Sequence, residues 1–154
     1  NLDEAIHRLN GTDLRVLRRA RVVRSSAIGP IAQPDFANTA LEIDTDLTPR
    51  ELFVRAKAIE RDMGRVDGPR WGPRPIDIDI LFFGDRVVQD DVLVIPHPEV
   101  SARSFVLAPL ADLVDVVGVA GRLFVMREAL ARLGGGAGAL ETIDARVLVF
   151  ASTP

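Results

Sequence analysis

Two aspartates, Asp77 and Asp79, alternate with isoleucines in an apolar stretch over residues 76–83. Because the side chains of a strand alternate between its faces, this stretch predicts a strand with both carboxylates on one face and the isoleucines in the core. Two such carboxylates lie about 7 Å apart and repel each other by roughly 2 kcal/mol, a cost that a cation between them removes. An oxygen-only ligand set favours Mg²⁺ over zinc, so we predict a magnesium site at Asp77 and Asp79. A solvated strand face is the alternative for the pair taken alone.

Three arginines, Arg65, Arg70 and Arg74, stand in the glycine- and proline-rich stretch 65–75 that precedes the acidic strand. Guanidinium groups match phosphate oxygens, and Mg²⁺ is commonly held by one or two carboxylates together with substrate phosphates. A basic loop beside an acidic strand therefore indicates phosphoryl transfer, in which catalysis rests on positioning and charge stabilisation. The sequence has no G-x-x-x-x-G-K-[ST] motif, which excludes a P-loop enzyme. A surface loop with scattered arginines is the alternative.

The composition is that of a globular chain. Its 154 residues carry 19 basic and 22 acidic side chains, a net charge of −3, and 47% hydrophobic residues, which predicts a single domain over 1–154. Among the basic residues, Lys57 is the only lysine. The chain is too apolar for intrinsic disorder, lacks an apolar run that could span a membrane, and is too acidic for a general nucleic-acid binder. It has no cysteine, which excludes disulfides and thiolate metal sites. Because residues 1–24 do not follow the order of a secretory signal, we expect a cytoplasmic protein without membrane or nucleic-acid partners.

Apolar periodicity, helix caps and chain breaks predict alternating short helices and strands. Thr48-Pro49-Arg50-Glu51 is a capping box with proline at the first helical position, the strongest helix start in the chain. Neither an internal repeat nor a long linker interrupts the pattern, which indicates one α+β layer structure. The predicted helices are 2–9, 49–63, 101–114 and 124–133, and the predicted strands are 14–24, 39–43, 76–83, 86–88 and 146–150, with 76–83 and 86–88 forming a hairpin.

Four groups of residues are similar to motifs of one known family. They are RWGPRPIDIDI at 70–80, IPHP at 95–98 with RSFVLAPL at 103–110, GP at 29–30 with QPDFAN at 33–38, and IE at 59–60 with GR at 64–65. Together they resemble the 6-hydroxymethyl-7,8-dihydropterin pyrophosphokinases, of which the first motif looks like the signature. Because the motifs are separated and keep the family's order, the resemblance over about residues 14–112 is specific.

The resemblance implies an α+β fold with a ferredoxin-like, mainly antiparallel sheet flanked by helices. It also implies a diphosphokinase that transfers pyrophosphate from ATP to the hydroxymethyl group of the pterin, giving AMP and the pterin diphosphate in folate biosynthesis. ATP is then the co-substrate, two Mg²⁺ ions are the expected cofactors, and a monomer or weak dimer is expected. No strong base is required, because metal activation and alignment of the hydroxyl supply most of the rate.

The resemblance assigns roles to individual residues of this sequence. The implied catalytic residues are Arg65, Arg74, Asp77 and Asp79, of which the two aspartates are also the metal ligands. The implied ATP-binding residues are Arg70, Arg74, His97 and Arg103. The implied substrate-binding residues are Ser25, Ile28, Phe36, Asn38, Trp71 and Phe105. Within this last set, Phe36 and Phe105 would hold the pterin ring between them, and Asn38 would hydrogen-bond its edge.

One departure from the family concerns the start of the domain. The family begins with a strand that ends in Gly-Ser-Asn and lies inside the sheet, whereas Asn1 here already falls in the first predicted helix. We therefore expect this strand to be absent, either because the native start precedes Asn1 or because the chain is a remodelled relative that binds a pterin or nucleotide with impaired catalysis. Losing an interior strand would leave two ladder edges open. An unrelated Mg²⁺-dependent phosphotransferase or nuclease that uses the two aspartates is the third hypothesis.

Overall fold

The computed structural model describes residues 1–26, 34–66, 74–134 and 147–153. Within them lie the helices α1 Leu2–Leu9, α2 Pro49–Asp62, α3 Ser104–Leu110 and α4 Met126–Arg132. The strands are β1 Leu14–Arg19, β2 Val23–Ser25, β3 Phe36–Thr45, β4 Asp77–Phe83, β5 Val88–Gln89, β6 Val94–Ile95, β7 Val116–Val119, β8 Arg122–Val125 and β9 Val147–Thr153. No helix of the described residues is long and apolar enough to cross a membrane.

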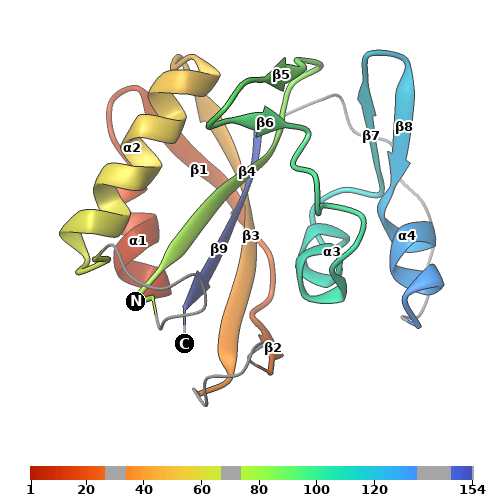
Figure 1. Cartoon of the computed structure of the whole chain (residues 1–154), viewed down its shortest axis with the longest axis horizontal. Helices are drawn as coiled ribbons and strands as arrows, with labels where there is room; N and C mark the ends of the chain where they lie inside the picture. The colour runs from red at the N-terminus through yellow and green to blue at the C-terminus, as the bar shows by residue number, and fades with distance from the viewer. Residues whose placement is uncertain (27–33, 67–73, 135–146, 154) are drawn as a thin grey trace.

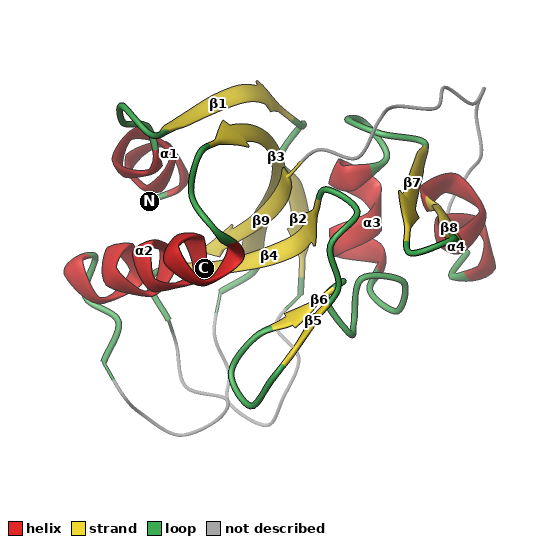
Figure 2. Cartoon of the chain, turned by 90° about the horizontal axis from the view of Figure 1, so that it is seen from above, coloured by secondary structure: helices red, strands yellow, loops and turns green. Residues whose placement is uncertain are grey.

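An antiparallel sheet with the strand order β1-β3-β9-β4 forms the centre of the molecule, and the short β2 pairs with the start of β3 (Figure 1). Helices α1 and α2 lie on one face of this sheet, and α3 lies on the other (Figure 2). The β5–β6 and β7–β8 pairs are separate small antiparallel sheets. The arrangement confirms the predicted α+β class, a mainly antiparallel sheet flanked by helices.

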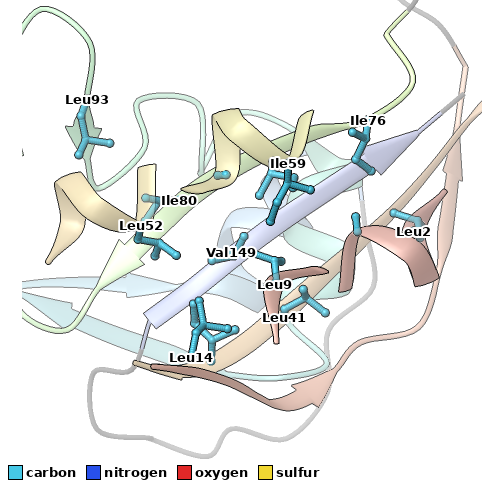
Figure 3. Packing of buried hydrophobic residues seen from close by; sticks show 14 of the residues in the cluster. Leu2, Leu9, Leu14, Leu41, Leu52, Ile59, Ile76, Ile80, Leu93 and Val149 are labelled. Carbon is cyan, nitrogen blue, oxygen red and sulfur yellow. The ribbon is translucent and has the colours of Figure 1, made fainter. Parts of the chain in front are cut away.

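Two apolar cores join the layers. The core between the sheet and helices α1 and α2 contains Leu9, Leu41 and Leu52, which Figure 3 shows from close by. The second core, on the face that carries α3, contains Ala40 and Phe82. Leu41 and Ala40 are neighbours in β3 and enter opposite cores, as the alternation of a strand that is buried on both faces requires.

Helix α2 is fixed at both ends by its own sequence. Thr48 Oγ1 accepts a hydrogen bond from the Glu51 backbone N–H at 3.3 Å, and Glu51 Oε2 accepts one from the Thr48 backbone N–H at 2.8 Å, which confirms the predicted capping box. At the other end Gly64 adopts a φ of 94°, and Arg65 donates its backbone N–H to the Glu60 carbonyl at 2.9 Å. This glycine-dependent turn brings Arg65 back against the last turn of the helix.

The strand predicted at 146–150 is observed as β9, which begins at Val147 and extends beyond the prediction to Thr153, and it occupies the interior of the sheet. It lies between β3 and β4 and runs antiparallel to both, so it pairs the backbone groups of these two strands that face it. Its register sets Ser152 opposite Asn38 on one side and opposite Asp77 on the other. The start of β3, the end of β9 and the start of β4 therefore meet at one end of the sheet.

The strands predicted over 14–24 and 39–43 also have different bounds in the structure. The strand predicted over 14–24 is divided into β1 and β2, because the Ala20 carbonyl accepts a hydrogen bond from the Thr39 hydroxyl at 2.9 Å and the Arg21 backbone N–H donates to Asp112 at 3.3 Å. Neither group is then left to continue the ladder. Strand β3 begins at Phe36 rather than at residue 39, because Phe36 pairs with Ser25 of β2.

The predicted hairpin of 76–83 with 86–88 is wrong. The segment at 88–89 pairs instead with β6, because Asp90 Oδ1 accepts hydrogen bonds from the backbone N–H groups of Val92 and Leu93 at 3.0 and 2.9 Å and closes the turn between β5 and β6. The helices predicted over 101–114 and 124–133 are shorter and form α3 and α4. The β7–β8 hairpin, which was not predicted, takes Phe124 and Val125 from the second of these predicted helices.

Candidate active site

Strand β4 positions the two aspartates as the sequence predicts. Ile78 and Ile80 are buried in the core under α2, and Asp77 and Asp79, which alternate with them, are half-buried. The side chains of Asp77 and Asp79 keep 30% and 28% of their surface exposed. Both carboxylates are therefore accessible to a ligand while their backbone is held in the sheet.

The ammonium group of Lys57 lies between the two aspartates. Lys57, in the second half of α2, places its Nζ 3.8 Å from Asp77 Oδ1 and 3.9 Å from Asp79 Oδ1. The same Nζ donates hydrogen bonds to Glu60 Oε1 at 2.8 Å and to the Ile78 carbonyl at 3.2 Å. Helix α2 thus supplies the carboxylates of β4 with a positive charge.

Glu60 connects helix α2 to strand β4. Its side chain is only 1% exposed, and Oε1 accepts a hydrogen bond from the Ile78 backbone N–H at 2.7 Å. Oε2 accepts from Arg65, whose Nη1 also donates to Asp77 Oδ1 at 2.7 Å. The charged cluster, as we call Lys57, Glu60, Arg65, Asp77 and Asp79, is therefore one continuous network. Because Glu60 bonds the backbone between the two aspartates, it fixes their position relative to the helix.

The carboxylates of the charged cluster have shifted pKa values. Burial raises the pKa of Asp79, and the negative charge of Asp77 raises it further. Burial would also raise the pKa of Asp77, but the positive charges of Lys57, Arg65 and Arg74 outweigh it and lower that pKa below its ordinary value. Two aspartates on one face of one strand are thus shifted in opposite directions. Such pairs are typical of functional sites.

The two aspartates fit a Mg²⁺ site that a substrate would complete. Mg²⁺ usually takes one or two protein carboxylates and fills its other positions with water and phosphate oxygens. In the ranges that the structure describes, no group of three or more His, Asp or Glu side chains is arranged to hold a metal. Asp77 and Asp79 would therefore supply part of the coordination and leave the rest to a phosphate-bearing ligand.

Four of the predicted basic residues converge on the acidic pair. Arg74 Nη1 lies 3.3 Å from Asp77 Oδ2, and Arg65 contacts the same carboxylate. His97 and Arg103 lie close enough to Asp79 that their electrostatic contributions favour its ionised form. The His97 backbone N–H donates to the Leu81 carbonyl at 2.9 Å, which ties this residue to β4.

The predicted pterin-side residues Ser25, Phe36 and Asn38 meet at the paired ends of β2 and β3. Asn38 is 1% exposed, and its Nδ2 donates to the Val23 carbonyl at 2.9 Å, to Ser25 Oγ at 3.0 Å and to the Phe36 carbonyl at 3.2 Å. Its Oδ1 is buried and accepts no hydrogen bond from the described part of the chain. A buried acceptor of this kind is costly unless it meets a donor, which a ligand could supply.

Of the remaining predicted residues, Phe105 lies within the described part of the chain and three others do not. Phe105 lies half-buried in the first turn of α3, a helix that contacts both β2 and β3, so it is on the same side of the sheet end as the Asn38 group. Ile28, Arg70 and Trp71 lie outside the described residues, and their roles stay predictions.

The structure also shows residues of the site that the sequence analysis did not assign. Glu60 was noted only as part of a motif, and Lys57 only as the single lysine. Their spacing of three residues on a predicted helix was the available signal, because such residues are neighbours on the helix surface. Ser152, which lies opposite Asn38 and Asp77, had no such signal, because strand pairing between distant segments leaves little trace in a single sequence.

Comparisons with known proteins agree with this geometry. The family model described as 7,8-dihydro-6-hydroxymethylpterin-pyrophosphokinase matches residues 1–115. The 2-amino-4-hydroxy-6-hydroxymethyldihydropteridine pyrophosphokinase of Methylorubrum extorquens is 43% identical over 120 residues, which cover 78% of this chain and 75% of that protein. The protein with the same name in Pseudomonas aeruginosa is 43% identical over 110 residues, 71% of this chain and 67% of that protein.

Plant relatives are longer. The mitochondrial folate synthesis bifunctional protein of Pisum sativum is 44% identical over 113 residues, which cover 73% of this chain but 22% of that protein. The chain thus spans about a fifth of the length of such relatives, as it also does for the corresponding Arabidopsis thaliana protein, of which 20% is covered. The family match over residues 1–115 and the identity to the bacterial enzymes show that this chain belongs to the 7,8-dihydro-6-hydroxymethylpterin-pyrophosphokinase family.

Proposed function

We propose that the chain transfers pyrophosphate from ATP to 6-hydroxymethyl-7,8-dihydropterin, giving AMP and the pterin diphosphate for folate synthesis. One observation carries the proposal: Asn38 and Asp77 both lie opposite Ser152, on the two sides of β9. Neighbouring strands are about 4.8 Å apart, so the buried acceptor and the acidic pair are separated by roughly 10 Å. A pterin bound at Asn38 can therefore present its hydroxymethyl group to a phosphate bound at Asp77 and Asp79.

Asp77 and Asp79 would hold Mg²⁺ on the nucleotide phosphates, and we expect two ions. When bound, Mg²⁺ neutralises phosphate charge and fixes the orientation of the chain of phosphates. Arg74, His97 and Arg103, which lie near the aspartates, would bind phosphate oxygens, because the N–H groups of guanidinium and imidazole side chains donate to them. In this role the residues stabilise the negative charge that is redistributed during transfer.

Transfer releases AMP, so the bond between the β-phosphorus and the oxygen that bridges it to the α-phosphate breaks. The hydroxymethyl oxygen forms a new bond to the β-phosphorus, its proton leaves to solvent, and the bridging oxygen departs with AMP. Asn38 would orient the pterin for this attack by accepting a hydrogen bond at Oδ1, with the ring between Phe36 and Phe105. Alignment of this kind is the main contribution that a protein makes to such a reaction.

Three roles in this proposal belong to residues outside the described ranges. Arg70 would contact ATP, and Ile28 and Trp71 would contact the pterin, as the family resemblance implies. We also propose a cytoplasmic protein that acts as a monomer or weak dimer, which gel filtration of the purified chain and fractionation of cells would test.

The experiment that tests the function is an assay of AMP. The protein is incubated with ATP, Mg²⁺ and 6-hydroxymethyl-7,8-dihydropterin, and AMP is measured with and without the pterin. We expect pterin-dependent AMP that disappears when EDTA removes the metal. Binding of nucleotide by calorimetry without AMP would instead identify a catalytically impaired binding protein. Metal-dependent cleavage of DNA or RNA without AMP would point to a nuclease.

The pterin-side role of Asn38 has a separate test. Asn38→Ala removes the buried acceptor, and we expect the KM for the pterin to rise about tenfold, the cost of one lost hydrogen bond, with the KM for ATP unchanged. Thr39→Val is the matched control, because Thr39 is the next residue in β3, is fully buried, and bonds the Ala20 carbonyl instead. A rise of both KM values, or an equal effect of the two variants, would contradict the assignment of Asn38.

A further inference from the structure

Lys57 is the one lysine in a chain that otherwise uses arginine for its basic side chains. It stands in the charged cluster, with its Nζ almost equally far from Asp77 Oδ1 and Asp79 Oδ1, at 3.8 and 3.9 Å. Hydrogen bonds to Glu60 and to the Ile78 carbonyl hold the ammonium group in this position. The only lysine is thus directed at the two proposed metal ligands from the neighbouring helix.

The shape of the ammonium group suits this position. It is a compact charge with three donors, whereas a guanidinium is a planar fork that binds one carboxylate with two parallel bonds. The hydrogen bonds of the neighbouring arginines reach the pair at Asp77, since Arg65 Nη1 joins Asp77 to Glu60 and Arg74 Nη1 lies 3.3 Å from Asp77 Oδ2. The ammonium group approaches three carboxylates and one carbonyl, and oxygen atoms of the same kinds surround a bound Mg²⁺ ion.

We propose that Lys57 is the resident counter-cation of the acidic pair: it holds Asp77 and Asp79 in place while no metal is bound, and a divalent cation competes with it for the same oxygens. This inference rests on the proposed function, because it takes the aspartates as metal ligands. It adds a positioning residue that acts through Asp77 and Asp79 and sets how tightly the free protein binds a divalent cation. A divalent cation bound to the same carboxylate oxygens would lie about 4 Å from the ammonium group, and like charges that close repel strongly near a protein surface. The metal and the ammonium group therefore cannot both stay at the two aspartates.

Titration with Mn²⁺ alone, followed by electron paramagnetic resonance of the free ion, tests the competition without any substrate. Lys57→Met keeps the length of the side chain and removes its charge, and we expect it to bind Mn²⁺ about tenfold more tightly than the wild type. Lys57→Arg keeps the charge and should bind Mn²⁺ less tightly than Lys57→Met does. Unchanged or weaker binding by Lys57→Met would overturn the proposal, because a merely structural role predicts that the ligands become disordered and bind less.

A control variant and a replacement variant keep the Mn²⁺ titration interpretable. Arg50→Met removes the same charge from the first turn of α2, where Arg50 pairs with Asp90 at 2.7 Å, and should leave Mn²⁺ binding unchanged within about twofold because that charge is screened from the acidic pair. If Lys57→Met fails to fold, as thermal unfolding would show, Lys57→Gln replaces it, and the wild type offers a measurement that needs no variant.

That measurement uses the single lysine directly. Acetic anhydride acetylates the Lys57 side chain, and mass spectrometry of the peptide that contains it gives the labelling rate. We expect Mn²⁺ to raise this rate several-fold, because the metal displaces Nζ from its carboxylates. An unchanged or lower rate would contradict displacement. Neither readout requires turnover. AMP formation with no effect of Lys57 on Mn²⁺ binding would reject this inference alone. An effect of Lys57 on Mn²⁺ binding without AMP formation would reject the proposed function alone.

Discussion

Helix α2 carries an ion-pair network on each of its halves, and the two networks are built differently. In the first half Arg55 meets Asp13 through two parallel hydrogen bonds of 2.6 Å each, one guanidinium fork on one carboxylate. In the second half the charged cluster shares three carboxylates among Lys57 and Arg65, and the ammonium lies 3.8 and 3.9 Å from the aspartates rather than at hydrogen-bond distance. Within the described residues, Arg55 bonds both oxygens of Asp13, whereas the Lys57 ammonium meets Asp79 only at 3.9 Å.

The electrostatic consequences follow this difference. Hydrogen bonds from Arg55 lower the pKa of Asp13, so its ionised form is stabilised by the fold itself. In the charged cluster, burial and Asp77 raise the pKa of Asp79, so its ionised form is disfavoured until another cation arrives. A carboxylate whose charge is fully paired stabilises the folded protein, whereas a carboxylate whose charge is only partly compensated favours binding of a further cation. We therefore propose a structural role for Asp13 and a functional role for Asp79.

The largest expected effect separates these two aspartates by activity. Asp79→Asn should reduce AMP formation at least about 10²-fold, because a preorganised charge that acts on the transferring phosphates is lost. Asp13→Asn makes the same chemical change beside the same helix and should retain wild-type turnover. Steady-state kinetics of both variants, with melting temperatures to confirm folding, provide the measurement. Comparable turnover in the two variants would remove the functional distinction between the two networks.

A smaller effect on stability is expected from Glu60, which joins helix and strand. Glu60→Met should lower the free energy of unfolding by about 2 kcal/mol, because the Ile78 backbone N–H loses its acceptor in the interior. Glu60→Gln keeps an amide oxygen for this N–H and should recover most of the loss. The matched control is Glu51→Met in the exposed capping box, where water replaces the lost bond. Urea unfolding measures all three, and an equal loss in the Glu60 and Glu51 variants would contradict the connecting role.

Sequence reasoning captured the parts of this molecule that depend on neighbouring residues. The capping box of α2 and the alternation of aspartates and isoleucines in β4 are local patterns, and the structure confirms both. The hairpin assigned to 86–88 was wrong because a turn at Asp90, several residues further along, gives that segment another partner. Short apolar runs do not by themselves specify which strand they pair with.

The placement of β9 shows the same limit at longer range. The sequence predicts a strand at 146–150, but the pairing of β9 with both β3 and β4 is settled only when three distant segments meet. The candidate site depends on this pairing, because Asn38 and Asp77 share the neighbour Ser152. The motifs of the sequence were enough to predict which residues belong to the site. The hydrogen-bond network that connects them through Lys57 and Glu60 became visible only in the folded structure.

The smallest expected effect concerns the pH dependence of the Asp13–Arg55 pair. Because the pKa of Asp13 is lowered from its ordinary value of 3.8, the pair contributes stability above that pH and loses it as the pH falls through the lower folded value. The difference in melting temperature between the wild type and Asp13→Asn should therefore be constant from pH 8 to about 5 and vanish in stronger acid. Arg55→Gln should give the same profile, since it removes the other half of the pair. A difference that persists unchanged into acid would show that Asp13 acts through packing rather than charge, and the contrast with the charged cluster would lose its electrostatic basis.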